Sequence, residues 1–386
     1  MMKRVVWIDW LRAIACLMVL LGHSAEPFAF NDEGVNFLTE SDAWWVGIIY
    51  CMAASCVALF VVASSYLQFP LHYSTGEFFR RRAARIIVPF VIWSLIYAFL
   101  WGDPIENLGN LLLNFNYEAG HLWFVYMLLG LYLLMPLLSP WAERVSKREL
   151  QFYLLLCFVT TLIPIVSVLA SDGDMVVFGP SGVPNTAEYP LWGVASWNRY
   201  GLFYYLSGFV GYVLLGLYMR RFAGHGAQAK VAILALLCRI LGFTIGLIWF
   251  MAIIYGLASN GFPLNGPTEM IVQINKPFSH DGICVYLMTV GSLFLFRMIR
   301  ADGWFYQRVI LQISKVGYGI FLSHMIILYM VSEWLRDALG IGTDGLLGVF
   351  TTPLQIILTA MFSLTISTIV CILIQRIPKF GKWIVG

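Results

Sequence analysis

The sequence predicts an all-α fold, a polytopic membrane protein built as a bundle of about ten transmembrane helices. Of its 386 residues, 60% are hydrophobic and only 12% are charged, whereas soluble domains carry about 25% charged residues. Ten apolar segments approach or exceed the length that a helix needs to cross a bilayer, which is roughly 20 residues. The connections between them alternate between rich and poor in Lys and Arg, as the positive-inside rule expects.

The ten predicted helices are bounded by turn-forming or charged residues. They span residues 5–29, 44–68, 83–101, 122–138, 149–170, 199–219, 229–256, 280–299, 311–334 and 350–375. Inside a bilayer every backbone group must be satisfied within the protein, and a helix does this for each span. No connection has the composition of an interdomain linker, so residues 1–386 are predicted to form a single integral membrane domain. Gly242 and Gly246 form a GxxxG pattern in the seventh helix, which indicates close helix packing.

Basic residues gather on one side of the predicted bundle. That side receives Lys3, Arg4, Arg80, Arg81, Arg82, Arg85, Arg144, Lys147, Arg148, Arg220, Arg221, Lys230, Arg297, Arg300, Arg308, Lys315, Arg376, Lys379 and Lys382. The other side has Arg199, Lys276 and Arg336 and is richer in acidic residues. Because cytoplasmic loops carry the excess of Lys and Arg, both termini are predicted to be cytoplasmic.

The first predicted helix contains ionisable residues in an otherwise apolar span. Asp9, Arg12, His23 and Glu26 fall roughly on one side of this helix. Arg12 and His23 are separated by about 16 Å along the axis, so Arg12 is predicted near one membrane face and His23 deeper. Ionisable groups within a membrane are costly and indicate a functional site. The alternative is a structural polar contact between helices.

Four arginines bunch at the start of the third predicted helix, in the segment FFRRRAARIIVPF at 78–90. They are Arg80, Arg81, Arg82 and Arg85. The planar guanidinium fork suits phosphate groups, so the cluster could hold a phosphorylated cytosolic molecule. The alternative is a basic loop that only determines topology.

Two further histidines are candidates for a polar passage through the bundle. His121 precedes Trp123 at the outer mouth of the fourth helix, where the pair could present a polar group and a stacking surface to a sugar. The alternative is a capping His and an interfacial Trp. His324 falls near the middle of the ninth helix, and Tyr318 lies on the same side of that helix. A histidine at this depth usually faces a bundle interior or cavity, although a structural hydrogen bond between helices also fits.

Several other chemistries lack a signature. The sequence has no GxGxxG, Walker A, GxSxG or HExxH motif, which argues against nucleotide-dependent redox chemistry, NTP hydrolysis, esterase-type serine catalysis and zincin chemistry. The seven cysteines are scattered without a CxxC pair, so neither a disulfide framework nor a metal site is expected.

Taken together and in order, these segments resemble the acyltransferase family 3 membrane proteins over residues 5 to about 330. The pieces that carry the resemblance are Asp9, Leu11, Arg12 and His23 with Arg-x10-His spacing, ALFVVASSYL, RRRAARIIVP, HLWF with YLLMPLL, FYYLSGFVGYVLLG, and VGYGIFLSH. One departure is visible at Ser64-Ser65-Tyr66, where the family usually has Ser-Gly before the Tyr. The family's ten helices agree with the number counted from hydropathy.

The resemblance implies a multi-pass enzyme of the inner (plasma) membrane that moves an acyl group from acyl-CoA, most often acetyl-CoA, to a hydroxyl of a surface or exported glycan. Its partners would be the acyl-CoA, the glycan and the lipid bilayer, with no nucleic acid and no permanently bound cofactor. Two other functions stay open: a transporter or exporter of a glycan or lipid-linked intermediate, and a sensor or scaffold.

Roles for the candidate residues combine this resemblance with their spacing in the chain. The catalytic residues would be His23 as the general base, Glu26 as its orienting carboxylate, and Arg12 with Asp9 paired to it one turn away. The phosphates of the donor would lie on Arg82, Arg85 and Arg12, and Arg81 and Tyr66 would join the donor site. His121, Trp123, Tyr318 and His324 would line the passage of the acceptor or thioester.

Overall fold

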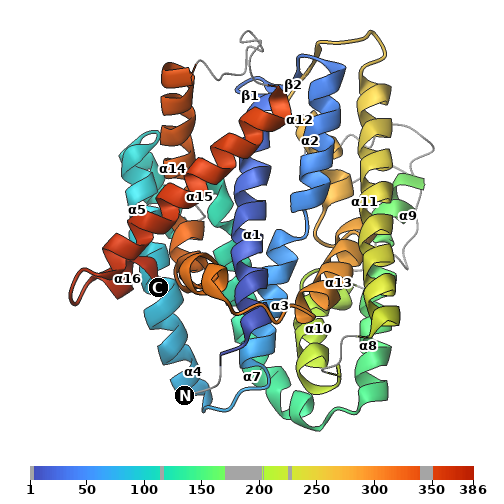
Figure 1. Cartoon of the computed structure of the whole chain (residues 1–386), viewed down its shortest axis with the longest axis vertical. Coiled ribbons are helices and arrows are strands. Elements are labelled where there is room, and N and C mark those ends of the chain that lie inside the picture. The colour runs from blue at the N-terminus through green and yellow to red at the C-terminus, as the bar shows by residue number, and fades with distance from the viewer. Residues whose placement is uncertain (1–3, 114–116, 170–201, 203, 225–227, 340–350) are drawn as a thin grey trace. The chain divides into compact units, whose positions relative to one another are not determined.

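The computed structural model describes residues 4–113, 117–169, 202, 204–224, 228–339 and 351–386 (Figure 1). Within these residues, nine helical segments are long and apolar enough to cross a membrane. They are Val6–Phe28, Glu40–Gln68, Thr75–Leu100, Ala119–Arg144, Lys147–Val166, Ala229–Leu257, Glu269–Arg297, Tyr306–Leu335 and Thr352–Gln375. The predicted all-α polytopic fold is therefore confirmed.

The predicted helix at 199–219 has no counterpart among these nine segments. In its place the structure has a 3-10 turn, η5 (Tyr204–Leu206), and a helix of 12 residues, α10 (Val210–Arg221). Residues 199–201 and 203 lie outside the described part of the chain. The other nine predicted helices each overlap one of the candidate spans.

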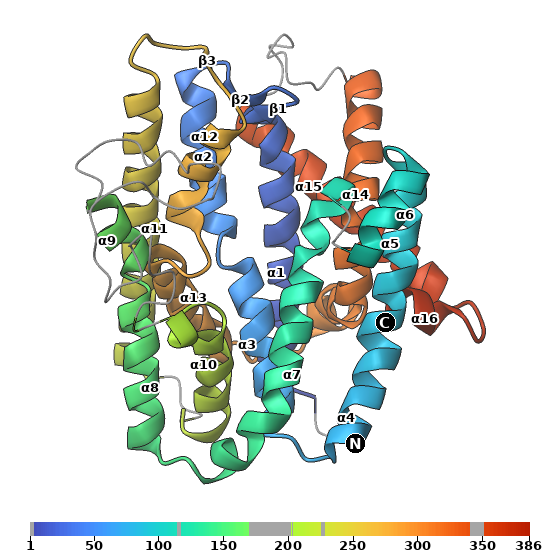
Figure 2. The same cartoon turned by 180° about the vertical axis from the view of Figure 1, so that it is seen from behind.

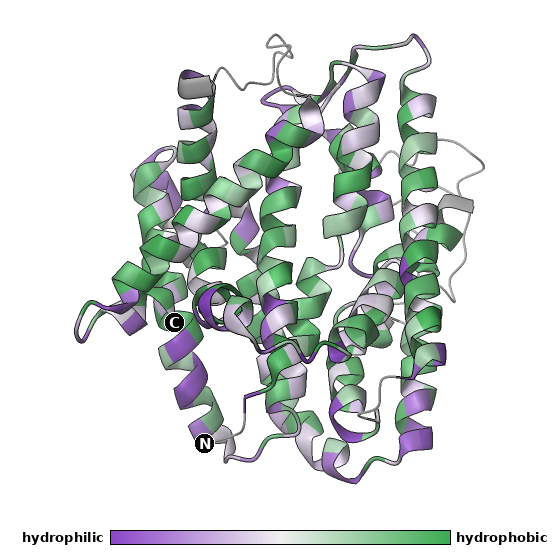
Figure 3. Cartoon of the chain, in the orientation of Figure 1, coloured by the Kyte–Doolittle hydropathy of each residue, from purple (hydrophilic) through white to green (hydrophobic). Residues whose placement is uncertain are grey.

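The helices are apolar along most of their length, and polar residues concentrate near helix ends and in connections (Figure 3). Helix α4 (Thr75–Arg82) is the exception, because it carries the arginine-rich segment. Ser74 begins this helix as its N-cap, where its hydroxyl accepts from the backbone N–H of Glu77. A cap of this kind satisfies one of the free N–H groups of the first turn.

The chain divides into two compact units, each assembled from separate stretches of sequence. The first comprises residues 1–24, 68–144 and 300–386. Besides α4 it contains α1 (Val6–Ala25), the π-helical turn η2 (Ala83–Ile87), α5 (Val88–Leu100), α6 (Pro104–Leu113), the 3-10 turn η3 (Tyr117–Leu122), α7 (Trp123–Arg144), the π-helical turn η7 (Tyr306–Ile310), α14 (Leu311–Leu339), α15 (Thr352–Gln375) and α16 (Gly381–Val385). The predicted single integral membrane domain stays a prediction.

The second unit comprises residues 25–67 and 145–299. Besides η5 and α10 it contains η1 (Glu26–Phe28), β1 (Phe30–Asn31), β2 (Gly34–Phe37), α2 (Glu40–Ala53), α3 (Cys56–Gln68), α8 (Lys147–Thr160), α9 (Ile163–Leu169), α11 (Ala229–Leu257), β3 (Leu264–Gly266), α12 (Glu269–Asn275), η6 (Lys276–Phe278) and α13 (Ile283–Arg297) (Figure 2). The three short strands form an antiparallel sheet in the order β1-β2-β3.

In the first unit, contacts between side chains fix the directions of the helices. Asp9 contacts Ser314 and His23 contacts His324, so α1 and α14 run parallel. His121 and Phe124 of the fourth span contact His324 and Phe321 in reverse order, so α7 runs antiparallel to α14. These directions agree with the alternation predicted for the first, fourth and ninth spans. Which membrane face α1 and α14 start from stays a prediction.

In the second unit, α11 packs closely against α13 through its glycines. A Cβ added at Gly242 would lie 2.6 Å from the carbonyl oxygen of Cys284, and one at Gly246 would lie 3.6 Å from the Cβ of Cys284. The first distance is too short for any side chain, so the backbone approach at Gly242 depends on glycine. The prediction that the GxxxG pattern serves helix packing is confirmed.

We expect Gly242→Ala to destabilise the protein because the new methyl group forces α11 and α13 apart. Overpacking of this kind typically costs about 1–3 kcal/mol. Gly256→Ala is the matched control on the same helix, since a Cβ there meets nothing within 4 Å. Thermal unfolding of both purified variants in detergent is the measurement, and an unchanged midpoint for Gly242→Ala would contradict the packing argument.

Candidate functional site

Three histidines from three segments of the first unit meet in a cluster, in which His324 is fully buried and His23 and His121 are half-buried. The ring centroids of His23 on α1 and His324 on α14 are 5.1 Å apart, and those of His121 in η3 and His324 are 5.0 Å apart. Tyr97 on α5 lies beside His121, with its ring centroid at 4.8 Å. Each histidine is a predicted candidate from a different span, and the structure brings all three together.

His324 is completely buried, and one of its ring nitrogens has a defined partner. Its Nδ1 lies 2.5 Å from the backbone carbonyl oxygen of Phe321, one helical turn earlier. Because a carbonyl oxygen only accepts, Nδ1 must carry the proton, and Nε2 is then the unprotonated nitrogen. Nε2 is buried and has no hydrogen-bond partner among the described residues. Nε2 of His324 is therefore a buried, unprotonated nitrogen that accepts no hydrogen bond from the described residues.

His121 packs against Tyr97, which is itself hydrogen-bonded to the backbone of α14. The hydroxyl of Tyr97 donates to the carbonyl oxygen of Leu322 at 2.9 Å. The Nε2 atom of His121 is buried without a partner among the described residues. Two imidazole nitrogens of the cluster, one on His121 and one on His324, thus lack a hydrogen-bond partner among these residues.

Electrostatics limit the charge that this cluster can carry. Two positive charges about 5 Å apart repel by roughly 3 kcal/mol even at an effective dielectric constant of 20. Three adjacent imidazoles are therefore most stable with no more than one proton beyond the neutral state. Such a cluster can take up one proton and release it again, which is what general base catalysis requires.

One face of α14 links this cluster to the arginine-rich segment. The hydroxyl of Tyr318 donates to the carbonyl oxygen of Ile86 in η2 at 2.9 Å, and its ring stacks on Phe321 with centroids 6.4 Å apart. Phe321 in turn contacts His324 at 5.7 Å. The predicted shared side of Tyr318 and His324 is confirmed, and Tyr318 adjoins the segment that carries Arg85.

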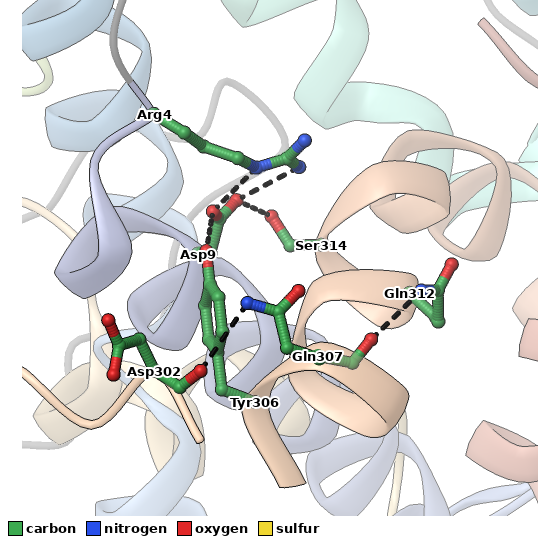
Figure 4. Close-up of polar contacts among 7 residues, drawn as sticks. All are labelled: Arg4, Asp9, Asp302, Tyr306, Gln307, Gln312 and Ser314. Atoms are coloured by element: carbon green, nitrogen blue, oxygen red, sulfur yellow. Dashed lines mark hydrogen bonds and ion pairs between the residues drawn. The ribbon is translucent and has the colours of Figure 1, made fainter. Parts of the chain in front are cut away.

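Asp9 forms a polar network at the start of α1 (Figure 4). Its carboxylate accepts from Arg4 Nε at 2.9 Å, from the hydroxyl of Tyr306 at 2.8 Å and from that of Ser314 at 2.6 Å. The hydrogen bond that Arg4 donates to Asp9 raises the pKa of Arg4 above its usual value, so this pair stays ionised. Asp9 itself is 4% exposed, and it joins α1 to η7 and α14.

The prediction that Asp9 pairs with Arg12 is wrong. Asp9 points toward η7 and α14, and Arg4, which precedes the helix, reaches back to it. Arg12 is half-buried on α1 and forms no ion pair with the described residues. Its guanidinium is therefore available for an anionic ligand.

The arginine-rich segment separates into two pairs. Arg80 and Arg81 bind Glu77 at 2.8 and 2.6 Å, and Arg81 also lies over the ring of Tyr73. Arg82 instead lies over two aromatic rings, those of Phe78 and Tyr132, and its Nε is buried without a partner among the described residues. Arg85 is exposed in η2. Arg82 and Arg85 are thus the cations of this segment that Glu77 does not neutralise.

Three further predicted site residues are Trp123 on α7 and, in the second unit, Glu26 and Tyr66. Trp123 is 36% exposed and its ring lies against Phe124. Glu26 begins η1, and Tyr66 lies in α3, where its carbonyl oxygen accepts from Arg220 at 3.4 Å; both belong to the second unit. Their roles in orienting His23 and in binding the donor stay predictions.

Sequence reasoning missed four residues that build this unit's polar sites. Arg4, Tyr306 and Ser314 hold Asp9, and Tyr97 supports His121. Only Arg4 had a local signal, a cation five residues before a buried acid. Among the described residues, no group of three or more His, Cys, Asp or Glu side chains is arranged to hold a metal ion.

The comparisons with known proteins give one match. The model of a protein family described as an acyltransferase domain, acyltransferase family 3, matches residues 5–375, which is nearly the whole chain. No curated protein and no solved structure matches the chain.

Proposed function

The chain belongs to acyltransferase family 3, and from this premise we propose that it transfers an acyl group, most simply acetyl, from cytosolic acyl-CoA to a hydroxyl of a surface or exported glycan. The observation that carries the proposal is the cluster of His23, His121 and the fully buried His324 within apolar helical segments. Neutral imidazoles suit the removal of a proton from a hydroxyl near neutral pH. We place the enzyme in the inner membrane with both termini in the cytoplasm.

The arginines of the first unit support an acyl-CoA donor. Arg82 and Arg85 offer guanidinium groups that Glu77 does not occupy, and Arg12 has no ion-pair partner among the described residues. Phosphate groups are bound well by such forks. In this proposal the CoA phosphates lie on Arg82, Arg85 and Arg12, and the thioester extends along Tyr318 and Phe321 toward the histidines.

The chemical step would be a direct acyl transfer with His23 as base. The O–H bond of the acceptor breaks and its proton moves to His23, while the hydroxyl oxygen forms a bond to the thioester carbonyl carbon. The C–S bond then breaks, and CoA leaves as a thiolate that takes the proton held by His23, which restores the neutral base. The network around Asp9 gives this residue an anchoring role, since its carboxylate is fully engaged with Arg4, Tyr306 and Ser314.

The direct test is thiol release by the purified protein in lipid nanodiscs. Incubation with acetyl-CoA and exported glycan fractions should release free CoA and add the mass of one acyl group to a glycan. A transporter would leave the thioester intact, so a folded wild-type protein that releases no thiol with acetyl-, succinyl- or longer acyl-CoA would overturn the proposal. Comparison of surface glycans from cells with and without the gene identifies the acceptor.

We expect Arg82→Ala to raise the KM for acyl-CoA about tenfold or more, because a charge-assisted contact to phosphate is worth roughly 1.5–3 kcal/mol. Arg80→Ala is the matched control, since Arg80 is already engaged by Glu77 and is exposed. Steady-state kinetics of thiol release measure both constants. Equal KM values for the two variants would show that the segment serves topology alone.

A further inference from the structure

We propose that His324 is the positioning residue of His23: its Nε2 accepts a hydrogen bond from the imidazole of His23 and thereby fixes which nitrogen of His23 is basic. This inference rests on the proposed function and adds a role for a second histidine in the same site. It gives His324 the task that a carboxylate performs for the catalytic histidine in a Ser-His-Asp triad.

The backbone of α14 prepares His324 for this role. The carbonyl oxygen of Phe321 holds the proton on Nδ1, at 2.5 Å, and this leaves Nε2 as an acceptor. Nε2 is buried and has no donor among the described residues. An unsatisfied buried acceptor is destabilising, which favours any rearrangement that brings a donor to it.

His23 is a polar ring close enough to His324 to supply that donor. Its centroid lies 5.1 Å from that of His324, with the ring planes tilted by 43°. At this separation, a turn of the His23 ring can bring one of its nitrogens to about 3 Å from Nε2 of His324, a normal hydrogen-bond distance. Catalytic hydrogen bonds are often long in the absence of substrate and shorten when it binds.

The hydrogen bond would determine the tautomer of His23. If the N–H of His23 donates to Nε2 of His324, the other nitrogen of His23 is unprotonated and is the base for the acceptor hydroxyl. When that nitrogen takes the proton, His23 becomes an imidazolium whose N–H still donates to His324. The positive charge is then stabilised by a neutral acceptor, and His324 itself neither gains nor loses a proton.

A neutral orienting group suits the interior of a membrane span. An isolated carboxylate at this depth would be costly before the reaction begins, whereas a neutral imidazole carries no charge. His121 supports the arrangement, because its ring meets His324 edge-on at 85° and is itself packed against Tyr97. His324 therefore has little freedom to turn away from His23.

The test compares His324→Leu with His324→Gln by steady-state thiol release in the presence of acceptor. We expect His324→Leu to lower kcat by roughly 100-fold, the upper range for loss of an orienting partner, with the KM for acyl-CoA unchanged. His324→Gln should keep kcat within about tenfold of the wild type, because its amide oxygen can accept from His23. Ser323→Ala is the control on the same helix, since this buried hydroxyl bonds within α14 and to Cys371.

Two results with the single variants would overturn the inference. One is a wild-type kcat in a folded His324→Leu variant, and the other is an equal loss of kcat in the Gln and Leu variants. A double-mutant cycle adds a readout that does not depend on folding of the Leu variant. If His324 acts only through His23, adding His324→Gln to the His23→Ala variant should not lower kcat further. A kcat lowered by the product of the two single effects would contradict the proposal. Failure of the wild type to release thiol would instead overturn the proposed function.

Discussion

Replacing His23 with Ala should abolish acyl transfer while the protein remains folded. His23 is the proposed base, and general base catalysis contributes typically 10²–10⁴-fold, so transfer should fall by about 10³-fold. The side chain is only half-buried and its removal leaves the contact between His121 and His324 in place, so we expect little loss of stability. Thiol release and acylated glycan are measured together, with thermal unfolding as the check on folding.

His121→Phe offers a comparison within the same cluster. In the proposed mechanism His121 supports His324 and takes no proton, so this variant should lose less activity than His23→Ala. Transfer at the wild-type rate by His23→Ala would contradict the assignment of the base while leaving the membership of the family untouched.

Asp9→Ala should destabilise the protein by about 2–3 kcal/mol, in the range for removing a buried charged acceptor from several donors. The substitution leaves Arg4, Tyr306 and Ser314 without their shared partner and loosens the contact of α1 with η7 and α14. Thermal or denaturant unfolding in detergent measures the loss. The catalytic role first assigned to Asp9 predicts another outcome, a stable protein that has lost activity alone.

Glu77→Ala is the matched control for Asp9→Ala. Glu77 also binds two cationic groups, Arg80 and Arg81, but it is partly exposed and both arginines are exposed. Exposed ion pairs contribute little to stability, so the midpoint of unfolding should hardly change. A similar loss in both variants would show that burial of Asp9 is not the cause.

Much of the fold and many site residues could be predicted from the sequence, because a bilayer imposes strong rules on both. Long apolar segments gave the spans, and the rarity of charges in them identified Arg12, His23 and His324 one at a time. The meeting of His23 with His121 and His324 could not be predicted without the family resemblance, since these residues are up to 301 positions apart in the chain. Packing of α1 and α7 on α14 creates the site.

The errors came from local reasoning. Spacing along one helix made Arg12 the partner of Asp9, but the partners come from before the helix and from two other segments. Spacing within one helix predicts which side chains share a face. Which residues those side chains contact depends on the neighbouring segments. The apolar run that predicted a span at 199–219 contains Gly208, Gly211 and Gly216, and the helix described there is short, Val210–Arg221.

The π-helical turn η2 lies between α4 and α5 in the third span and changes the directions in which their side chains point. Hydropathy cannot show this change. A π-helical turn accommodates one more residue than an α-helical turn, and each residue advances a helix by about 100°. The extra residue between α4 and α5 therefore rotates all later side chains of this span by about 100° around the helix axis. Arg82 and Tyr97 lie on opposite sides of this turn, so the direction in which the arginines point is set independently of the direction in which Tyr97 meets His121.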